Sequence, residues 1–208
     1  PPMTADARVA VLVYDGFHAD DGIGAYDVFA TAGRGGAPVD AALVTAGGPV
    51  DGEIEASDGT TVEPDRIVDP ADPPDVLIVP GGGWNKRAAD GAWAEAQRPP
   101  TVEAIRRCHR NGSLVAAVCT GSMLLAEAGL TDGRRAVTHP ATMGELSQTG
   151  ARTVDARVVD DGDVVTAAGD EAGIDLGLWL LEREWGPENS ESVADMIEYE
   201  FTSDIAPA

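Results

Sequence analysis

The sequence predicts an α/β fold in which a mainly parallel central sheet is covered by helices on both faces. Short runs rich in β-branched residues alternate with longer amphipathic stretches, which is the pattern of successive βαβ units. The strand-like runs are continuously apolar, as expected of strands buried on both faces. A length of 208 residues suits one such unit, so we expect residues 1–208 to form a single domain.

The first half of the chain supplies three of the predicted strands. Strands are predicted over 9–13, 41–45 and 75–79, and a helix over 21–33. The segment 47–74 is rich in Gly, Pro and Asp, and it predicts a hairpin or loop region around Ile54 and Val62. The strand over 75–79 runs directly into a turn of three glycines, Gly81 to Gly83.

The second half is predicted to be richer in helix. Helices are expected near Trp93, over 101–110, after Cys119, up to about Ser147, and over 171–185 and 188–200. Strands are expected over 114–118 and 136–139, the latter ended by Pro140. Residues 158–165 predict two strands joined by an Asp-Gly turn, which is a strong hairpin signal.

The charge balance excludes some partners. Acidic residues outnumber basic ones 36 to 14, which gives a formal net charge of -22, and Lys86 is the single lysine. This composition is typical of a halophilic protein, whose acidic surface is screened by concentrated salt. Without a basic patch to neutralise phosphates, nucleic acid is not an expected partner. Binding to a basic partner is the alternative explanation of the acidity.

The sequence also predicts a soluble, cytoplasmic protein. No stretch approaches the roughly 20 apolar residues that span a bilayer, and no leader pattern precedes the first strand. We therefore expect no membrane association. The two cysteines, Cys108 and Cys119, form neither a metal-ligand cluster nor a disulfide framework, so no metal site is expected.

Cys119 is the strongest candidate for chemistry. It follows the strand over 114–118 and begins a helix, and its neighbours Ala117 and Gly121 are small, as a sharp strand-to-helix turn requires. The start of a helix favours a thiolate over a thiol. Cys108 lies instead on the apolar side of its predicted helix, so we expect it to be a buried, unreactive thiol.

Further candidates follow other strands of the sheet, where ligands bind in open α/β folds. The Gly81–Gly83 turn exposes backbone N–H groups that can form an oxyanion hole, although a plain tight turn explains it equally well. Asp21 follows the first strand, where its alternative role is to favour the start of a helix. His139 ends a strand and is either a base or a structural residue.

At these residues the chain resembles the ThiJ/PfpI superfamily of class I glutamine-amidotransferase-like proteins. The resemblance covers nearly the whole chain and rests on the segments AAVCTG (116–121), VPGGG (79–83), TH (138–139) and AGIDL (172–176). It implies a flavodoxin-like three-layer sandwich. Thr120 stands where the PfpI-type peptidases have His, and the segment 14–29 resembles the isonitrile hydratase branch.

That resemblance implies roles for particular residues. Cys119 is the implied nucleophile and Asp21 the acid/base, with Thr120 as the hydroxyl neighbour of the thiol. The N–H groups of Gly82 and Thr120 are the implied oxyanion donors, with Gly83 as a further candidate. The resemblance also implies a homodimer that needs no cofactor and acts on a small molecule. Asp20 and Ala25 depart from the branch, which usually has an apolar residue and Pro there.

The expected reaction is therefore hydration of an isonitrile to an N-substituted formamide. Other reactions open to the same cysteine are attack on an α-oxoaldehyde and hydrolysis of a small amide. A redox sensor, in which Cys119 is oxidised without turnover, is the alternative of a different class. The branch also resembles sensor domains fused to AraC-type regulators, and residues 1–208 leave no room for a DNA-binding domain beside the predicted one.

Overall fold

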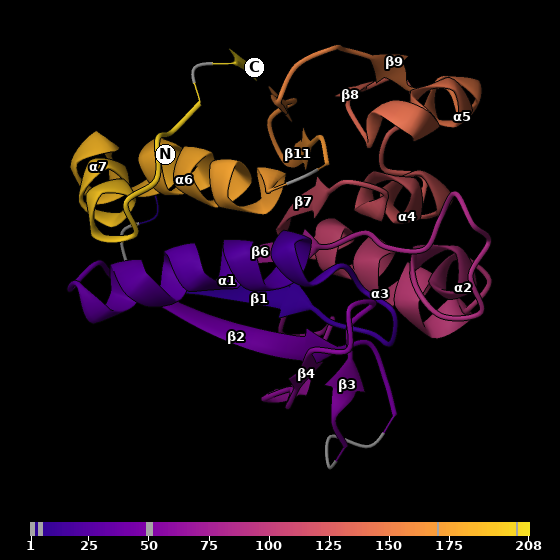
Figure 1. Ribbon diagram of the computed structural model, residues 1–208, viewed down its shortest axis with the longest axis horizontal. Helices are drawn as coiled ribbons and strands as arrows, with labels where there is room; N and C mark the ends of the chain where they lie inside the picture. Colours follow the sequence, from indigo (N-terminus) through magenta and orange to yellow (C-terminus); the bar gives the residue numbers. More distant parts are fainter. Residues whose placement is uncertain (1–2, 4–5, 49–51, 170, 203) are drawn as a thin grey trace.

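A sheet of eight strands forms the centre of the molecule, and helices cover both of its faces (Figure 1). The computed structural model describes residues 3, 6–48, 52–169, 171–202 and 204–208. The predicted α/β class, with a mainly parallel sheet between two helical layers, is confirmed. That residues 1–208 form one domain stays a prediction.

The strands of the central sheet are parallel with one exception. In spatial order they are β12 (Ile205–Ala206), β10 (Val158–Asp160), β11 (Val164–Ala167), β7 (Leu114–Val118), β6 (Val76–Val79), β1 (Ala7–Leu12), β2 (Val39–Thr45) and β5 (Arg66–Ile67). Only the β10–β11 pair is antiparallel. All residues of β6 and β7 are buried, as their continuous apolar runs predict.

Two further pairs of short strands lie outside this sheet. They are β3 (Ile54–Glu55) with β4 (Thr61–Val62), and β8 (Arg135–Ala136) with β9 (Arg152–Thr153). The predicted hairpin around Ile54 and Val62 is therefore confirmed for the described residues of segment 47–74, and residues 49–51 lie outside them.

The helices form two layers. On one face α1 (Ala19–Arg34) and α6 (Ala172–Trp185) lie side by side, with α7 (Pro187–Met196) against both (Figure 1). On the other face α2 (Ala92–Ala96), α3 (Pro99–Arg110) and α4 (Gly121–Glu127) pack together. A 3-10 helix, η1 (Pro140–Thr142), leads into α5 (Met143–Gln148) beside β9.

Two predicted elements are shorter than expected. The strand predicted over 136–139 ends at Ala136, because Thr138 and His139 turn away to begin η1 at Pro140. The helix predicted over 188–200 ends at Met196, and Glu198 has a positive φ of 54° that no helix continues through. The predicted hairpin at 158–165 is confirmed as the antiparallel β10–β11 pair.

The strand order places the functional candidates at one edge. The chain runs from β1 to β2 on one side of β1, then returns to build β6, β7 and β11 on the other side. The strand order therefore reverses between β1 and β6, and ligands bind beyond the carboxyl ends of the strands at such a point. The turns after β1, β6 and β7 meet there. Among the described residues, no helix is long and apolar enough to cross a membrane.

Candidate active site

Cys119 occupies a strained elbow between β7 and α4. Its φ is +56°, a left-handed conformation that costs a residue with a side chain about 1–2 kcal/mol. The elbow is held from both sides: the Cys119 N–H donates to the carbonyls of Ala167 (3.0 Å) and Ala168 (2.8 Å), and Thr138 Oγ1 donates to the Cys119 carbonyl (2.8 Å). Such strain persists where the surrounding structure enforces it, and it gathers at functional sites.

Cys119 opens into a cavity of about 930 Å³. The cavity is lined by residues from four places: the turn after β1, the β3–β4 hairpin, the segment after β6, and the elbow with His139. The lining includes Cys119, Thr120, Gly82, Gly83, His139 and His18. Of the predicted site residues, all but Asp21 line this cavity.

Asp21 lies beneath the cavity, in the first turn of α1, and its side chain is fully buried. The Gly81 N–H donates to Asp21 Oδ2 at 3.3 Å. Asp21 Oδ1 has no hydrogen-bond partner among the described residues, and His18 Nδ1 lies 3.4 Å from it. The structure thus confirms that Asp21 sits at the edge of the sheet where the elbow lies, but it separates the carboxylate from the cavity.

The turn after β6 packs tightly against the start of α4. A Cβ on Gly81 would lie 2.5 Å from the Thr120 nitrogen, so no other residue fits there. The Gly82 N–H, expected as an oxyanion donor, donates to Thr120 Oγ1 at 3.0 Å. A reacting oxygen would have to displace this hydroxyl to use the Gly82 N–H. The hydroxyl of Thr120 therefore occupies the acceptor position in front of the Gly82 N–H.

His139 has a structural role and also borders the cavity. It lines the cavity, yet its Nδ1 accepts the Ala141 N–H at 3.1 Å and caps η1. Since Nδ1 is an acceptor, the neutral ring carries its proton on Nε2. A Cβ on Gly169 would lie 2.6 Å from His139 Cδ2 and 3.5 Å from Cys119 Sγ, so both side chains border the same glycine.

Two residues of the site were not predicted from the sequence. Tyr14 is buried and its hydroxyl donates to the Pro80 carbonyl, just before the Gly81 turn. Burial raises the pKa of Tyr14 well above its usual value, and the nearby Asp21, Glu95 and Cys119 raise it further. His18 is the second. Its position three residues before Asp21 was the available signal, since that spacing brings two side chains to one side of a helix.

The two cysteines differ as predicted in their surroundings. Cys108 is completely buried in α3, and burial raises its pKa to about 11. Cys119 is partly exposed and lines the cavity. Because the thiolate is the reactive form, Cys108 is unreactive at neutral pH.

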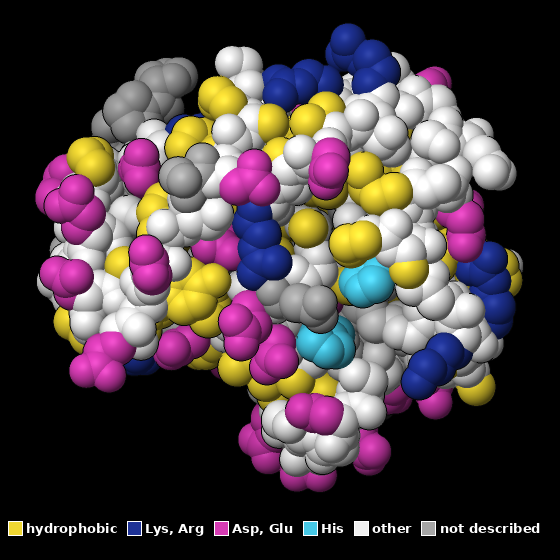
Figure 2. All heavy atoms as spheres, turned by 45° about the horizontal axis from the view of Figure 1, so that its top comes forward, with side chains coloured by type: hydrophobic (Ala, Val, Ile, Leu, Met, Phe, Trp, Pro, Cys, Tyr) yellow, Lys and Arg dark blue, Asp and Glu magenta, His cyan; other side chains and the backbone are white. Residues whose placement is uncertain are grey.

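The charge of the cavity wall is mainly negative. Four carboxylates line it, from Asp15, Glu53, Glu55 and Asp90, together with the amine of Lys86. Acidic side chains are also dispersed over the face of the molecule shown in Figure 2, where histidine side chains also reach the surface. Among the described residues, no group of three or more His, Cys, Asp or Glu is arranged to hold a metal ion.

The fold and the cysteine elbow define a known class of α/β protein. The model of the DJ-1/PfpI family matches residues 7–183. The chain therefore belongs to the DJ-1/PfpI family, as the sequence motifs predicted. A solved structure with this fold, a ThiJ/PfpI family protein from Pseudomonas syringae, superposes with a TM-score of 0.81 at 27% identity and covers 97% of this chain and 78% of that one.

Curated relatives differ in what they do. An isonitrile hydratase from Pseudomonas putida is 36% identical over 146 residues, which is 70% of this chain and 61% of the relative. The HTH-type transcriptional regulator CdhR from Pseudomonas aeruginosa is 33% identical over 148 residues, which is 70% of this chain and 42% of the regulator. The chain thus spans well under two thirds of both relatives. Family membership alone leaves the activity open.

Proposed function

We propose that this protein is a cysteine-dependent isonitrile hydratase, a lyase that adds water to R–NC and forms R–NH–CHO. The observation that carries the proposal is Cys119, held at a strained elbow and open to a 930 Å³ cavity beside Thr120 and Gly82. The similarity to an isonitrile hydratase supports the choice of substrate among the reactions open to such a cysteine.

The first step is attack by the Cys119 thiolate on the terminal carbon of the isonitrile. An S–C bond forms, and the same carbon receives a proton from the acid at Asp21, giving the thioimidate R–N=CH–S–Cys119. Asp21 is then a carboxylate. An acid held close to the reacting atoms accelerates such a proton transfer by about 10²–10⁴-fold. The elbow holds the sulfur in the cavity for this attack.

The second step is hydrolysis of the thioimidate. The Asp21 carboxylate takes a proton from water as the water oxygen bonds to the carbon, and the proton passes to the nitrogen. The tetrahedral species R–NH–CH(OH)–S–Cys119 then collapses: its hydroxyl proton returns to Asp21, the C=O bond forms and the thiolate leaves. The water supplies both hydrogens of the net reaction, and both catalytic groups return to their starting state. Thr120 and Gly82 stand where the oxygen develops.

Turnover tests the proposal directly. Purified protein is assayed with aliphatic and aromatic isonitriles, and formamide is quantified by chromatography. We expect turnover by the wild type and none by Cys119→Ala, whereas Cys108→Ala keeps turnover per folded molecule. Mass spectrometry after iodoacetamide should find label on Cys119 before Cys108. Formamide formation by Cys119→Ala at the wild-type rate would refute the role of the cysteine.

A sensor function is the second candidate, and the similarity to a transcriptional regulator favours it. In that case the cavity binds a small molecule, or Cys119 is oxidised, without turnover. Failure to convert any isonitrile, methylglyoxal or small amide, combined with ready oxidation of Cys119 by peroxide, would favour the sensor over the enzyme.

We also propose that the protein is a homodimer in the cytoplasm of a halophile. The 36 acidic against 14 basic residues support the halophilic cytoplasm, and the resemblance to the ThiJ/PfpI superfamily supports the dimer. Light scattering tests the dimer, and the melting temperature, measured from dilute buffer to molar KCl, tests the adaptation to salt. A monomer with an unchanged melting temperature throughout would overturn them.

A further inference from the structure

The buried position of Asp21 raises a question about proton transfer. Asp21 is fully buried and does not line the cavity, whereas Cys119 does. An acid/base must reach the substrate or its water, directly or through another group. Among the described residues, His18 is a titratable side chain that lies near both the cavity and the carboxylate. It lines the cavity, and its Nδ1 lies 3.4 Å from Asp21 Oδ1.

Both residues are hydrogen-bonded to the backbone of Gly81. The His18 N–H donates to the Gly81 carbonyl at 2.7 Å, and the Gly81 N–H donates to Asp21 Oδ2 at 3.3 Å. These two bonds join the start of α1 to the turn after β6 from opposite sides of residue Gly81. The backbone of His18 and the carboxylate of Asp21 are therefore both anchored to the same glycine.

The second carboxylate oxygen of Asp21, Oδ1, indicates which group exchanges a proton with it. Oδ1 is fully buried and has no hydrogen-bond partner among the described residues. A buried carboxylate oxygen without a hydrogen bond lowers the free energy of unfolding. A change of a few tenths of an ångström would bring His18 Nδ1 into a normal hydrogen bond with it. Catalytic hydrogen bonds are often long without substrate and shorten when it binds.

We propose that His18 and Asp21 form a proton-relay pair, in which His18 carries protons between the buried carboxylate and the substrate in the cavity. This inference rests on the proposed function and names a further catalytic residue for it. When the S–C bond forms, the ring of His18 donates the proton on its cavity side, at Nε2, to the isonitrile carbon. Asp21 stabilises the proton that stays on Nδ1. In the hydrolysis step the ring takes a proton from water and passes it to the nitrogen. When the tetrahedral species collapses, the ring takes the hydroxyl proton, so the pair regains the proton that it gave to the carbon.

Another charged group also lies near the ring. Asp58, on the β3–β4 turn, has a pKa lowered by the Thr60 backbone N–H and side chain and, to a smaller extent, by His18. Asp58 is exposed to solvent, whereas Asp21 is completely buried. Solvent therefore screens the interaction of His18 with Asp58 more strongly than its interaction with Asp21.

Ring tautomers test the pair without any turnover. Long-range ¹H–¹⁵N spectra of the labelled protein at neutral pH show which nitrogen carries the proton. We expect Nδ1–H for His18 in the wild type and in Asp20→Asn, and loss of that preference in Asp21→Asn. His139 is the internal control, because its Nδ1 accepts the Ala141 N–H and should stay unprotonated throughout. A His18 Nδ1 that carries no proton in the wild type would overturn the pair.

Kinetics then test the catalytic part. We expect His18→Gln to lower kcat for isonitriles about 10²-fold with little change in KM or in the rate of Cys119 alkylation. His109→Gln, in α3, should keep wild-type turnover, and added imidazole should restore part of the turnover of His18→Ala. A kcat of His18→Gln within twofold of wild type, or a loss that imidazole does not restore, would overturn the proposal. The expected tautomers in a protein that hydrates no isonitrile would support the pair and refute only the proposed function.

Discussion

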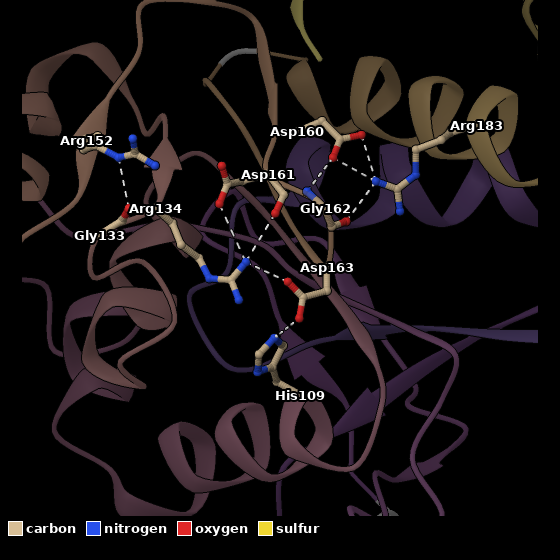
Figure 3. A network of polar contacts seen from close by, with 9 residues as sticks. All are labelled: His109, Gly133, Arg134, Arg152, Asp160, Asp161, Gly162, Asp163 and Arg183. Atoms are coloured by element: carbon tan, nitrogen blue, oxygen red, sulfur yellow. Dashed lines mark hydrogen bonds and ion pairs between the residues drawn. The ribbon is translucent and has the colours of Figure 1, made fainter. Parts of the chain in front are cut away.

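Two buried carboxylates, which lie at opposite ends of the strands of the central sheet, differ in their hydrogen bonding. At the end of the strands where β10 joins β11, Arg183 Nη1 donates to both oxygens of Asp160 at 2.8 Å, and the Gly162 N–H donates to Oδ1 (Figure 3). Trp179 Nε1 adds a further bond to Oδ2. At the cavity edge, the one hydrogen bond that Asp21 receives from the described part of the chain is a long one from Gly81, and no described residue bonds to Oδ1. Both carboxylates are buried to the same degree.

This difference distinguishes the structural edge around Asp160, which stabilises the fold, from the cavity edge around Asp21 and Cys119, where the candidate active site lies. A fully bonded carboxylate such as Asp160 stabilises the fold and has no capacity left for a ligand. Asp21, with an open oxygen, and Cys119, with its positive φ, are costly in the folded state. Costs of this kind are retained where function requires them. Substitutions at the two edges should therefore affect activity and stability in opposite proportions.

The largest expected effect is on turnover at the cavity edge. Asp21→Asn replaces the carboxylate with an amide of similar volume that can neither deliver nor accept the proton. We expect kcat for isonitriles to fall roughly 10²–10⁴-fold, as for loss of a general acid/base, with the fold intact by circular dichroism. Cys119 should still react with iodoacetamide.

Asp20→Asn is the matched control, because Asp20 precedes Asp21 in the same helical turn but is exposed. It should keep wild-type turnover. If Asp20→Asn abolishes turnover and Asp21→Asn does not, the acid/base has been assigned to the wrong residue of the pair. If both keep full turnover, His139 becomes the next candidate.

The next effect is on stability at the opposite edge. Arg183→Met removes the cation beside Asp160 and leaves a buried carboxylate with two remaining donors. Breaking a buried ion pair from one side costs about 3–5 kcal/mol of unfolding free energy, measured here by urea denaturation. Arg34→Met is the control, since Arg34 and Asp27 are both largely exposed at 3.7 Å and contribute at most about 1 kcal/mol. Turnover per folded molecule should stay at the wild-type level in both variants.

The sequence predicted most of the fold because its strands are buried on both faces. Runs such as 76–79 and 114–118 are wholly apolar, and glycines mark the turns that follow. The prediction was wrong where tertiary contacts determine the end of an element. Thr138 fits a strand by propensity, but its hydroxyl bonds to the Cys119 carbonyl, and the strand ends two residues earlier.

The site was predictable only in part. Cys119 is identifiable because a strand-to-helix elbow has a local signature, and the Gly81 turn likewise. The depth of Asp21 and the contact with His18 depend on how α1 meets the turn after β6, two segments sixty residues apart. No local sequence pattern shows that two segments so far apart in the chain are in contact. The bond between Gly82 N–H and Thr120 Oγ1 is hidden for the same reason.

The smallest expected effect concerns Asp163, which precedes β11 at the structural edge (Figure 3). Burial raises the pKa of Asp163, but hydrogen bonds from Arg134 Nη1 at 2.6 Å and His109 Nε2 at 2.8 Å outweigh it and hold the pKa below its usual value. A depressed pKa in the folded state means that the carboxylate stabilises the protein above its unfolded pKa. This contribution is lost as the pH falls through the folded pKa.

Asp163→Asn should therefore lower the unfolding free energy at pH 7 and have no effect once the wild-type carboxyl is protonated. The side chain is 56% exposed, so solvent screening limits the change to about 0.2–1 kcal/mol. Urea denaturation across the acid range measures it, and a double-mutant cycle with Arg134→Gln isolates the ion pair. An effect that persists at acid pH would mean that Asp163 acts through packing rather than charge. Turnover should not change, because the Asp163 edge and the Cys119 edge lie at opposite ends of β11 and β7.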